Sequence, residues 1–189
     1  MDRVSALFFV VAFSLLPISF ALAQEGKSQG ILEISFDFTR QRTIASNQYA
    51  VWIEDAQGNL VKTLFVTGFT GRGGYLRRPD CLPTWVKKAN PASRAPQEID
   101  AITGATPKSG TQLYTWDGRD EKGNFVPPGT YRFVIEATLY WSSRVLITGT
   151  FTYGGESVDS IPIKVEHFGG KENEGMITNV RARYQALRP

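Results

Sequence analysis

The chain has 189 residues, of which 21 are Lys or Arg and 18 are Asp or Glu, so its formal net charge at pH 7 is +3. This mild basicity falls well short of the charge of a nucleic-acid-binding domain, and we expect no nucleic-acid partner. The length suffices for one domain with a hydrophobic core of its own. The single Cys81 excludes an intramolecular disulfide, and a buried, unreactive thiol is its commoner state.

The N-terminal segment, residues 1–23, has the pattern of a secretory signal peptide. Arg3 precedes a long apolar run, and the small residues of an Ala-Leu-Ala sequence end at Ala23, where a signal peptidase would cut before Gln24. The alternative is a retained membrane anchor, because the run is near the lower length limit of a spanning helix. No later segment is long and apolar enough to span, so we expect a periplasmic or secreted mature chain, residues 24–189, that is not membrane-embedded.

Alternating apolar and polar residues predict β-strands on both sides of the middle of the chain. In residues 31–38, the side chains of Leu32, Ile34, Phe36 and Phe38 share one face, which is the period of a half-buried strand. Further strands are expected over 49–54, 60–67, 111–116, 145–153, 159–167 and 177–184, with Tyr131, Phe133, Ile135 and Ala137 facing the core. Short strands separated by Gly and Pro turns are typical of an all-β sandwich, which we expect to form a single domain.

Residues 68–110 interrupt this pattern. They are rich in Gly, Pro, Ser and Thr, and only residues 82–89 look helical, for about two turns. A loop of this length inside a compact domain is usually functional or disordered. Because it retains apolar anchors, we expect a long inserted loop that contains a short helix, packs on the sandwich and serves a function.

The segment WDGRDEKGNFVPPGTY, residues 116–131, combines turn residues with the start of a strand. It resembles the immunoglobulin-like domain of bacterial flagellar hook-capping proteins, which implies an immunoglobulin-like β-sandwich and says nothing about chemistry. With GFTGRGGYLRRPD…LPTW in the insertion and DAITGATPKSG at residues 100–110, most of the mature chain resembles a family of predicted periplasmic proteins of unknown function. Members of that family often occur near membrane-embedded PepSY-type proteins and flavin transferases.

The end of the insertion is similar to the acceptor motif of bacterial flavin transferases. That motif has Asp, two free positions, Ser or Thr, Gly, Ala, and a final Ser or Thr; Asp100, Thr103, Gly104, Ala105 and Thr106 meet every fixed position. These enzymes move FMN from FAD onto a hydroxyl through a phosphoester bond, so the resemblance implies covalent FMN on Thr106. Gly104 and Ala105 would leave little bulk beside the hydroxyl, and Gly104 would permit a sharp turn. Asp100 and Thr103 would hydrogen-bond across that turn.

The residues that follow Thr106 depart from the usual acceptors. Lys108 stands where acceptors commonly have another hydroxyl residue, and Pro107 stiffens the loop and removes a backbone donor. The alternative interpretation of the motif is an ordinary Thr-Gly turn ahead of the next strand.

Cationic and aromatic residues of the insertion are further candidates for contact with a cofactor. The cations are Arg72, Arg77, Arg78, Lys87, Lys88 and Arg94, opposed locally only by Asp80. Beside Thr106 they could neutralise the FMN phosphate or dock an acidic partner; a solvated basic surface is the alternative. Tyr75 and Trp85 could stack on the isoalloxazine ring, although aromatic residues that anchor a loop are commoner.

The sequence contains no catalytic constellation or metal site that we recognise. His167 and Cys81 each lack the partners that catalysis needs, and the loop with Asp117, Asp120 and Asn124 lacks the spacing of a calcium loop. Two functions therefore stay open. One is an electron-transfer module that a flavin transferase loads with FMN and that works with a membrane PepSY-type partner; the other is a flavin-free, immunoglobulin-like binding or assembly module of the cell envelope.

Overall fold

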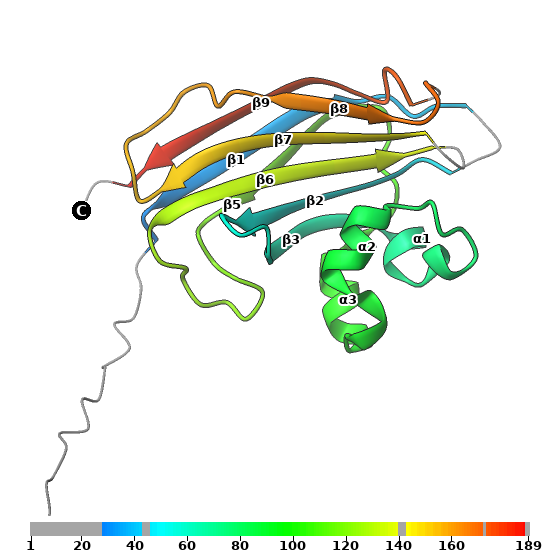
Figure 1. Cartoon of the computed structure of the whole chain (residues 1–189), viewed down its shortest axis with the longest axis horizontal. Helices are drawn as coiled ribbons and strands as arrows, with labels where there is room; N and C mark the ends of the chain where they lie inside the picture. The colour runs from blue at the N-terminus through cyan, green and yellow to red at the C-terminus, as the bar shows by residue number, and fades with distance from the viewer. Residues whose placement is uncertain (1–27, 43–45, 140–142, 172, 188–189) are drawn as a thin grey trace, which may run out of the picture.

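Two β-sheets packed face to face form the body of the protein (Figure 1). The computed structural model describes residues 28–42, 46–139, 143–171 and 173–187, so the expected signal peptide lies outside the described residues. One sheet has three strands in the order β5-β1-β9, and the other has six in the order β4-β3-β2-β6-β7-β8. All strand pairs are antiparallel except β3 with β4. The expected all-β sandwich is confirmed.

The insertion carries the helices, and the strands precede and follow it. The strands are β1 (Gly30–Phe38), β2 (Gln48–Asp55), β3 (Leu60–Thr67), β4 (Thr103–Gly104), β5 (Gly110–Trp116), β6 (Gly129–Thr138), β7 (Arg144–Tyr153), β8 (Lys164–Phe168) and β9 (Ile177–Ala186). The helices are α1 (Gly68–Gly71), α2 (Pro83–Ala89) and α3 (Pro96–Ile102), with the 3-10 turns η1 (Gly74–Leu76) and η2 (Pro91–Ser93) between them.

The main core lies between the two sheets. Along β1 every second residue is buried, beginning with Gly30 and including the four apolar side chains predicted to share a face. Successive side chains of a strand point to opposite faces, so this alternation places one face of β1 inside the sandwich. The predicted core residues of β6, from Tyr131 to Ala137, belong to the same cluster.

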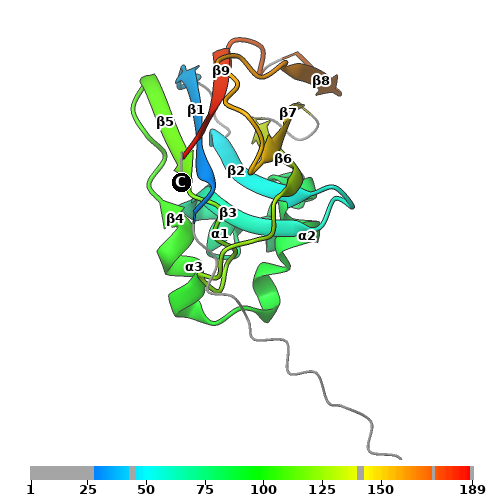
Figure 2. The ribbon, with the colours of Figure 1, turned by 90° about the vertical axis from the view of Figure 1, so that its left-hand side faces the viewer.

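A second, smaller core lies on the outer face of the six-stranded sheet, where α2 covers it (Figure 2). Tyr49, Val51 and Ile53 of β2 point into the main core, whereas Ala50 and Trp52 point outward and pack with residues of α2. This is why β2 is buried on both faces and shows no alternation in burial.

Two buried carboxylates join α2 to this sheet. Glu136 of β6 accepts hydrogen bonds from the backbone N–H groups of Thr84 (3.1 Å) and Trp85 (2.9 Å), the first N–H groups of the helix. Burial raises the pKa of Glu136 despite these hydrogen bonds. Glu54 of β2 pairs with Lys88 of α2 at 3.0 Å and accepts a hydrogen bond from Trp52 Nε1 at 2.7 Å.

The insertion contains more regular structure than the sequence predicts. The helix expected over 82–89 is confirmed as α2, but α3 and the short strand β4 follow it. In α3, Glu98 reaches back to accept a hydrogen bond from the Ala95 N–H at 3.1 Å, and Pro96 occupies the first turn. Both features favour a helix start.

The prediction of a strand over 159–167 is wrong for the first half of that range. Strand β8 begins only at Lys164, and the preceding residues lie beside β9, where the Ile161 N–H donates to the Ala182 carbonyl at 2.9 Å. Pro162 has no backbone N–H and cannot donate to a strand ladder, which separates the two parts.

Cys81 lies in the insertion just before α2 and is buried, as expected. Burial raises the pKa of its thiol to about 11. Because the thiolate is the reactive form, both burial and the raised pKa suppress reaction. We expect a thiol reagent at mildly alkaline pH to leave Cys81 unmodified in the native protein and to modify it fully in denaturant, as measured by intact mass. Rapid labelling of the native protein would contradict this burial.

Replacing Glu136 by Ala should destabilise the protein by about 3 kcal/mol, because two N–H groups of α2 lose their acceptor and Arg144 loses its carboxylate partner at 3.6 Å. The measurement is equilibrium unfolding in urea. Glu33→Ala is the matched control, since it removes a carboxylate from an exposed ion pair with Arg183 and should change the free energy of unfolding little. Equal losses in the two variants would show that Glu136 does not hold the insertion.

Candidate functional site

The candidate acceptor motif lies where the insertion returns to the sandwich. Asp100 is in the last turn of α3, and Thr103 and Gly104 form β4. These two residues pair in parallel with Val66 and Thr67 of β3, at the edge of the six-stranded sheet. The chain then continues through Ala105 and Thr106 toward β5.

Gly104 does not make the sharp turn that the sequence suggests. It is extended within β4 and is not among the glycines with positive φ. A Cβ at this position would lie 2.6 Å from Cε2 of Phe65, closer than real Cβ atoms come. Glycine is therefore required for the close approach of β4 to the Phe65 ring.

The predicted hydrogen bond between Asp100 and Thr103 involves the backbone of Asp100. Thr103 Oγ1 donates to the Asp100 carbonyl at 3.5 Å, which is long. The Asp100 carboxylate is instead paired with Arg72, whose Nε lies 3.1 Å from Oδ1, and both side chains are exposed. Arg72 Nη1 and the Gly104 carbonyl oxygen both border Gly68, where an added Cβ would lie 3.2 Å from the first atom and 3.3 Å from the second.

Thr106 itself is half-buried on the connection to β5. Its Oγ1 donates to the Asn47 carbonyl at 3.4 Å, a long and weak hydrogen bond. Ala105, just before it, is exposed. The connection ends at Gly110, whose φ of 141° is accessible mainly to glycine.

A pocket of about 430 Å³ opens beside Asp100 and Arg72. Its lining is Gly71, Arg72, Gly73, Tyr75, Pro91, Arg94, Pro96, Ile99 and Asp100. Tyr75 is half-buried in this wall. Four of the candidate residues therefore line this pocket: Arg72, Arg94, Tyr75 and Asp100. Thr106 is not part of the lining.

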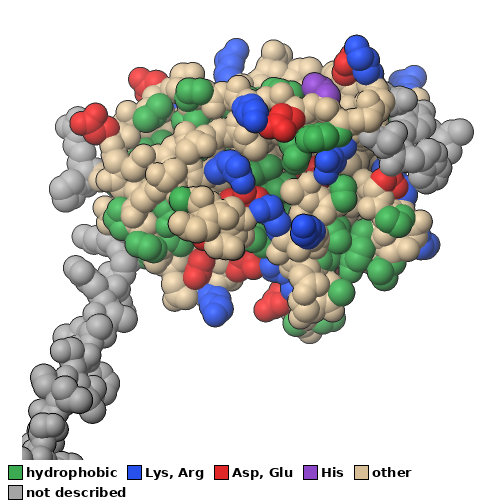
Figure 3. Space-filling model, viewed as in Figure 1, with side chains coloured by type: hydrophobic (Ala, Val, Ile, Leu, Met, Phe, Trp, Pro, Cys, Tyr) green, Lys and Arg blue, Asp and Glu red, His purple; other side chains and the backbone are tan. Residues whose placement is uncertain are grey.

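Four of the six cations of the basic cluster form ion pairs: Arg72 and Arg78 with acids of the insertion, and Lys88 and Arg94 with acids outside it, so the cluster is less cationic than its local sequence suggests. Arg78 pairs with Asp80 at 3.2 Å and is buried against Ser46, so it is not available at the surface. Arg94 pairs with Glu121 at 2.6 Å, and Lys88 pairs with Glu54. Arg77 lies 5.9 Å from the centroid of the Phe69 ring. On the face that carries α2, Lys and Arg side chains are interspersed with Asp and Glu (Figure 3).

Trp85 anchors the insertion and cannot stack on an external ring. Its side chain is fully buried in the second core, and its Nε1 donates to Thr63 Oγ1 at 3.2 Å. The alternative use of this tryptophan, as a packing residue, is therefore correct.

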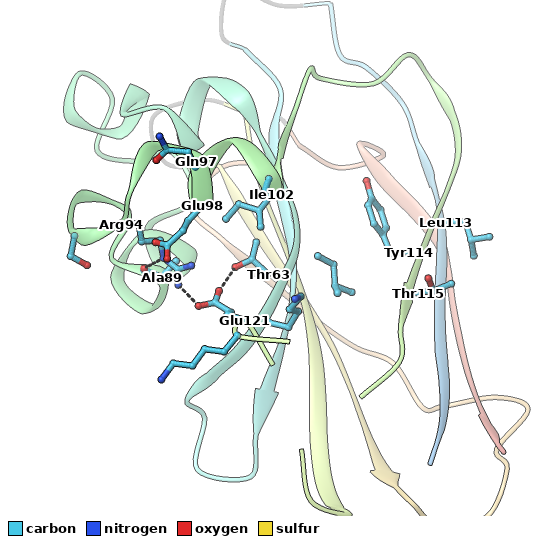
Figure 4. Close-up of a pocket in the computed structure, with 15 residues that line it drawn as sticks. Thr63, Ala89, Arg94, Gln97, Glu98, Ile102, Leu113, Tyr114, Thr115 and Glu121 are labelled. Atoms are coloured by element: carbon cyan, nitrogen blue, oxygen red, sulfur yellow. Dashed lines mark hydrogen bonds and ion pairs between the residues drawn. The ribbon is translucent and has the colours of Figure 1, made fainter. Parts of the chain in front are cut away.

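A larger groove, of about 960 Å³, separates α3 and β3 from β5 (Figure 4). Its walls are polar on the side of the insertion, where Glu121 accepts hydrogen bonds from Thr63 and Arg94. On the opposite side β5 contributes Leu113, Tyr114 and Thr115. This groove could not be predicted from sequence, because it forms between segments distant along the chain; the apolar Leu113 within a polar alternation is the one local signal.

Within the described residues, no group of three or more His, Cys, Asp or Glu side chains is placed to hold a metal ion. His167 is exposed on β8. In the same part of the chain, no helix is both long and apolar enough to cross a membrane.

Comparison with known proteins gives one match. The family described as "Predicted periplasmic protein (DUF2271)" matches residues 31–168, from the start of β1 to the end of β8, and so includes the insertion and the acceptor-like motif. Neither a curated protein nor a solved structure matches, so the resemblance to the immunoglobulin-like hook-capping domain stays a prediction. The description of the family confirms the periplasmic location expected from the sequence. The chain belongs to this family of predicted periplasmic proteins.

Proposed function

We propose that the protein carries FMN covalently on Thr106 and transfers electrons in the periplasm. One observation carries the proposal: the full acceptor motif, from Asp100 to Thr106, lies at the surface where the insertion meets the sandwich, with the exposed guanidinium of Arg72 on its Asp100. The flavin would supply the redox chemistry, and the protein would supply attachment, position and electrostatics.

The residues near the motif fit the two ends of FMN. The exposed Arg72, paired with the Asp100 carboxylate of the motif, suits a phosphate, because a guanidinium forms charge-assisted hydrogen bonds with phosphate oxygens. An exposed ion pair contributes little stability, so Asp100 competes weakly for that guanidinium. Tyr75 presents an aromatic ring in the wall of the 430 Å³ pocket, whose volume is within the range of small-molecule sites.

In the transfer step, Thr106 Oγ1 would form a bond to the phosphorus of the FMN half of FAD. The pyrophosphate P–O bond breaks, AMP leaves, and the hydroxyl proton passes to a base of the transferase. The chain contributes the nucleophile and its positioning, while the transferase contributes metal-assisted stabilisation of the leaving group.

The hydroxyl must first become accessible, because Thr106 is half-buried. Its Oγ1 is held by the hydrogen bond to the Asn47 carbonyl at 3.4 Å, and the net value of such a bond is about 1 kcal/mol or less. Short surface segments with few buried contacts open locally at small cost. Opening of residues 105–109 would present the hydroxyl while β4 and β5 stay in place.

The partners follow from the chemistry. A flavin transferase would load the protein, and a membrane PepSY-type protein would exchange electrons with it. The periplasmic location of the family supports both, because the known acceptor proteins of these transferases work outside the cytoplasm.

The test is the intact mass of the mature protein after export in a host with an active periplasmic flavin transferase. We expect the wild type to gain one FMN less one water, Thr106→Ser to retain the addition, and Thr106→Ala to lose it. Thr152→Ala is the matched control, since it removes an exposed threonine hydroxyl from β7 and should leave the modification intact.

An unmodified wild type, in a host where a known acceptor becomes labelled, would contradict flavin attachment. It would favour the second candidate, a flavin-free binding or assembly module of the cell envelope. The groove between α3 and β5 supports that candidate as a place where another molecule could bind. Its volume of about 960 Å³ exceeds that of the pocket beside Arg72.

A further inference from the structure

Three of the four sheet edges are protected against pairing with another strand. The edge of β9 is covered by the segment before β8, where Val158 and Tyr184 exchange two backbone hydrogen bonds of 2.8 Å. Strand β8 is short and carries Lys164 and Glu166. Strand β4 has only two residues. Short, charged or covered edges are the usual means by which proteins avoid edge-to-edge association.

The fourth edge, β5, has none of these protections from the residues that the structure describes. It runs for seven residues, Gly110–Trp116, and pairs with β1 along its whole length without a register shift. Its sequence GTQLYTW contains no charged residue and no proline. In the middle of the strand, Leu113 is 63% exposed. A flat, uncharged edge with an exposed apolar side chain is a template for an additional strand.

There is room beside this edge. Strand β5 lies at one margin of the molecule, away from the middle of the six-stranded sheet (Figure 2). On its inner side is the 960 Å³ groove, into whose lining Leu113, Tyr114 and Thr115 enter (Figure 4). A strand added to β5 would therefore meet open space along the edge.

We propose that this edge pairs with the β5 strand of a second copy of the protein. The occupant is inferred from the strand itself, because the sequence TQLYT is nearly symmetrical about Leu113. Antiparallel pairing about a two-fold axis at that residue places Leu113 opposite Leu113 of the second copy and Thr111 opposite Thr115 of the second copy. Threonine pairs and apolar pairs are favourable cross-strand neighbours.

Charge also permits this pairing. Each chain has a net charge of +3, but β5 contributes none of it, so no like charges face each other across the new ladder. On the adjacent strand β1, the carboxylates of Glu33 and Asp37 are satisfied within their own copy, by Arg183 and Asn179 respectively. The two three-stranded sheets would become one continuous six-stranded sheet, and the contact is isologous, as in most homodimers.

The first experiment measures the molar mass of the mature protein by light scattering after gel filtration, over a wide range of concentrations. We expect the wild type to reach twice the mass of one chain and Leu113→Lys to remain at the mass of one chain, because two ammonium groups would meet at the two-fold axis. Val165→Lys is the matched control: it replaces a 50% exposed apolar residue by Lys on β8, one of the protected edges, and should leave the dimer intact.

A second experiment tests the register. In Leu113→Cys the two introduced thiols would face each other across the strand pair, at a Cα separation of about 4.5–5.5 Å that a disulfide can span. Mild oxidation should give a covalent dimer, whereas Val165→Cys should not; the native Cys81 is buried and does not interfere. A wild type that stays monomeric, or a dimer that survives Leu113→Lys and yields no Leu113→Cys cross-link, would overturn the proposal.

Discussion

Two carboxylates, Glu54 and Glu136, are buried on the outer face of the six-stranded sheet, and the position of the whole insertion depends on how they are neutralised. A buried carboxylate without partners is costly, so each must be met by donors or cations. For Glu136 the donors are the first N–H groups of α2, and for Glu54 the cations are Lys88 of α2 and Arg132 of β6. Both requirements are satisfied only when α2 lies across β2 and β6. The fully buried side chains of Trp52 and Trp85 then fill the space between the helix and the sheet.

The candidate site follows from this arrangement. Once α2 is fixed, α3 follows it by way of η2, and Arg94, between η2 and α3, is held by Glu121 from the loop after β5. The chain leaves α3 after Ile102 and joins the edge of β3 as β4, close to the Phe65 ring. A rigid scaffold that carries functional residues on a short connection is a common way to place a reactive group at a surface. Here the short connection carries Thr106.

The sequence was a good guide to the strands and a poor guide to the insertion, for a physical reason. In β1 the alternation of side chains is a local property, and the burial of Leu32 to Phe38 repeats it. The helices α2 and α3 have seven residues each, too short to be stable on propensity alone. They form because of distant partners, such as Glu136 for Trp85 and Glu121 for Arg94. The motif could be located from sequence. Tertiary contacts were needed to show that Arg72 lies beside it, and that Trp85 and Arg78 are buried and cannot contact a cofactor.

The hydrogen bonds from the start of α2 to Glu136 have a consequence for the order of folding. Their partners are separated by 51 and 52 positions, and α3, β4, β5 and the connection from β5 to β6 lie between them. Contacts of such long range form slowly, because the chain between them must first be confined. The insertion therefore acquires its final shape only after β6 has paired with β2. A chain that crosses a membrane from its N-terminus exposes residues 68–110 before β6 arrives, so the flavin attachment that we propose could take place in that interval, when the Thr106 hydroxyl is accessible without any loop having to move.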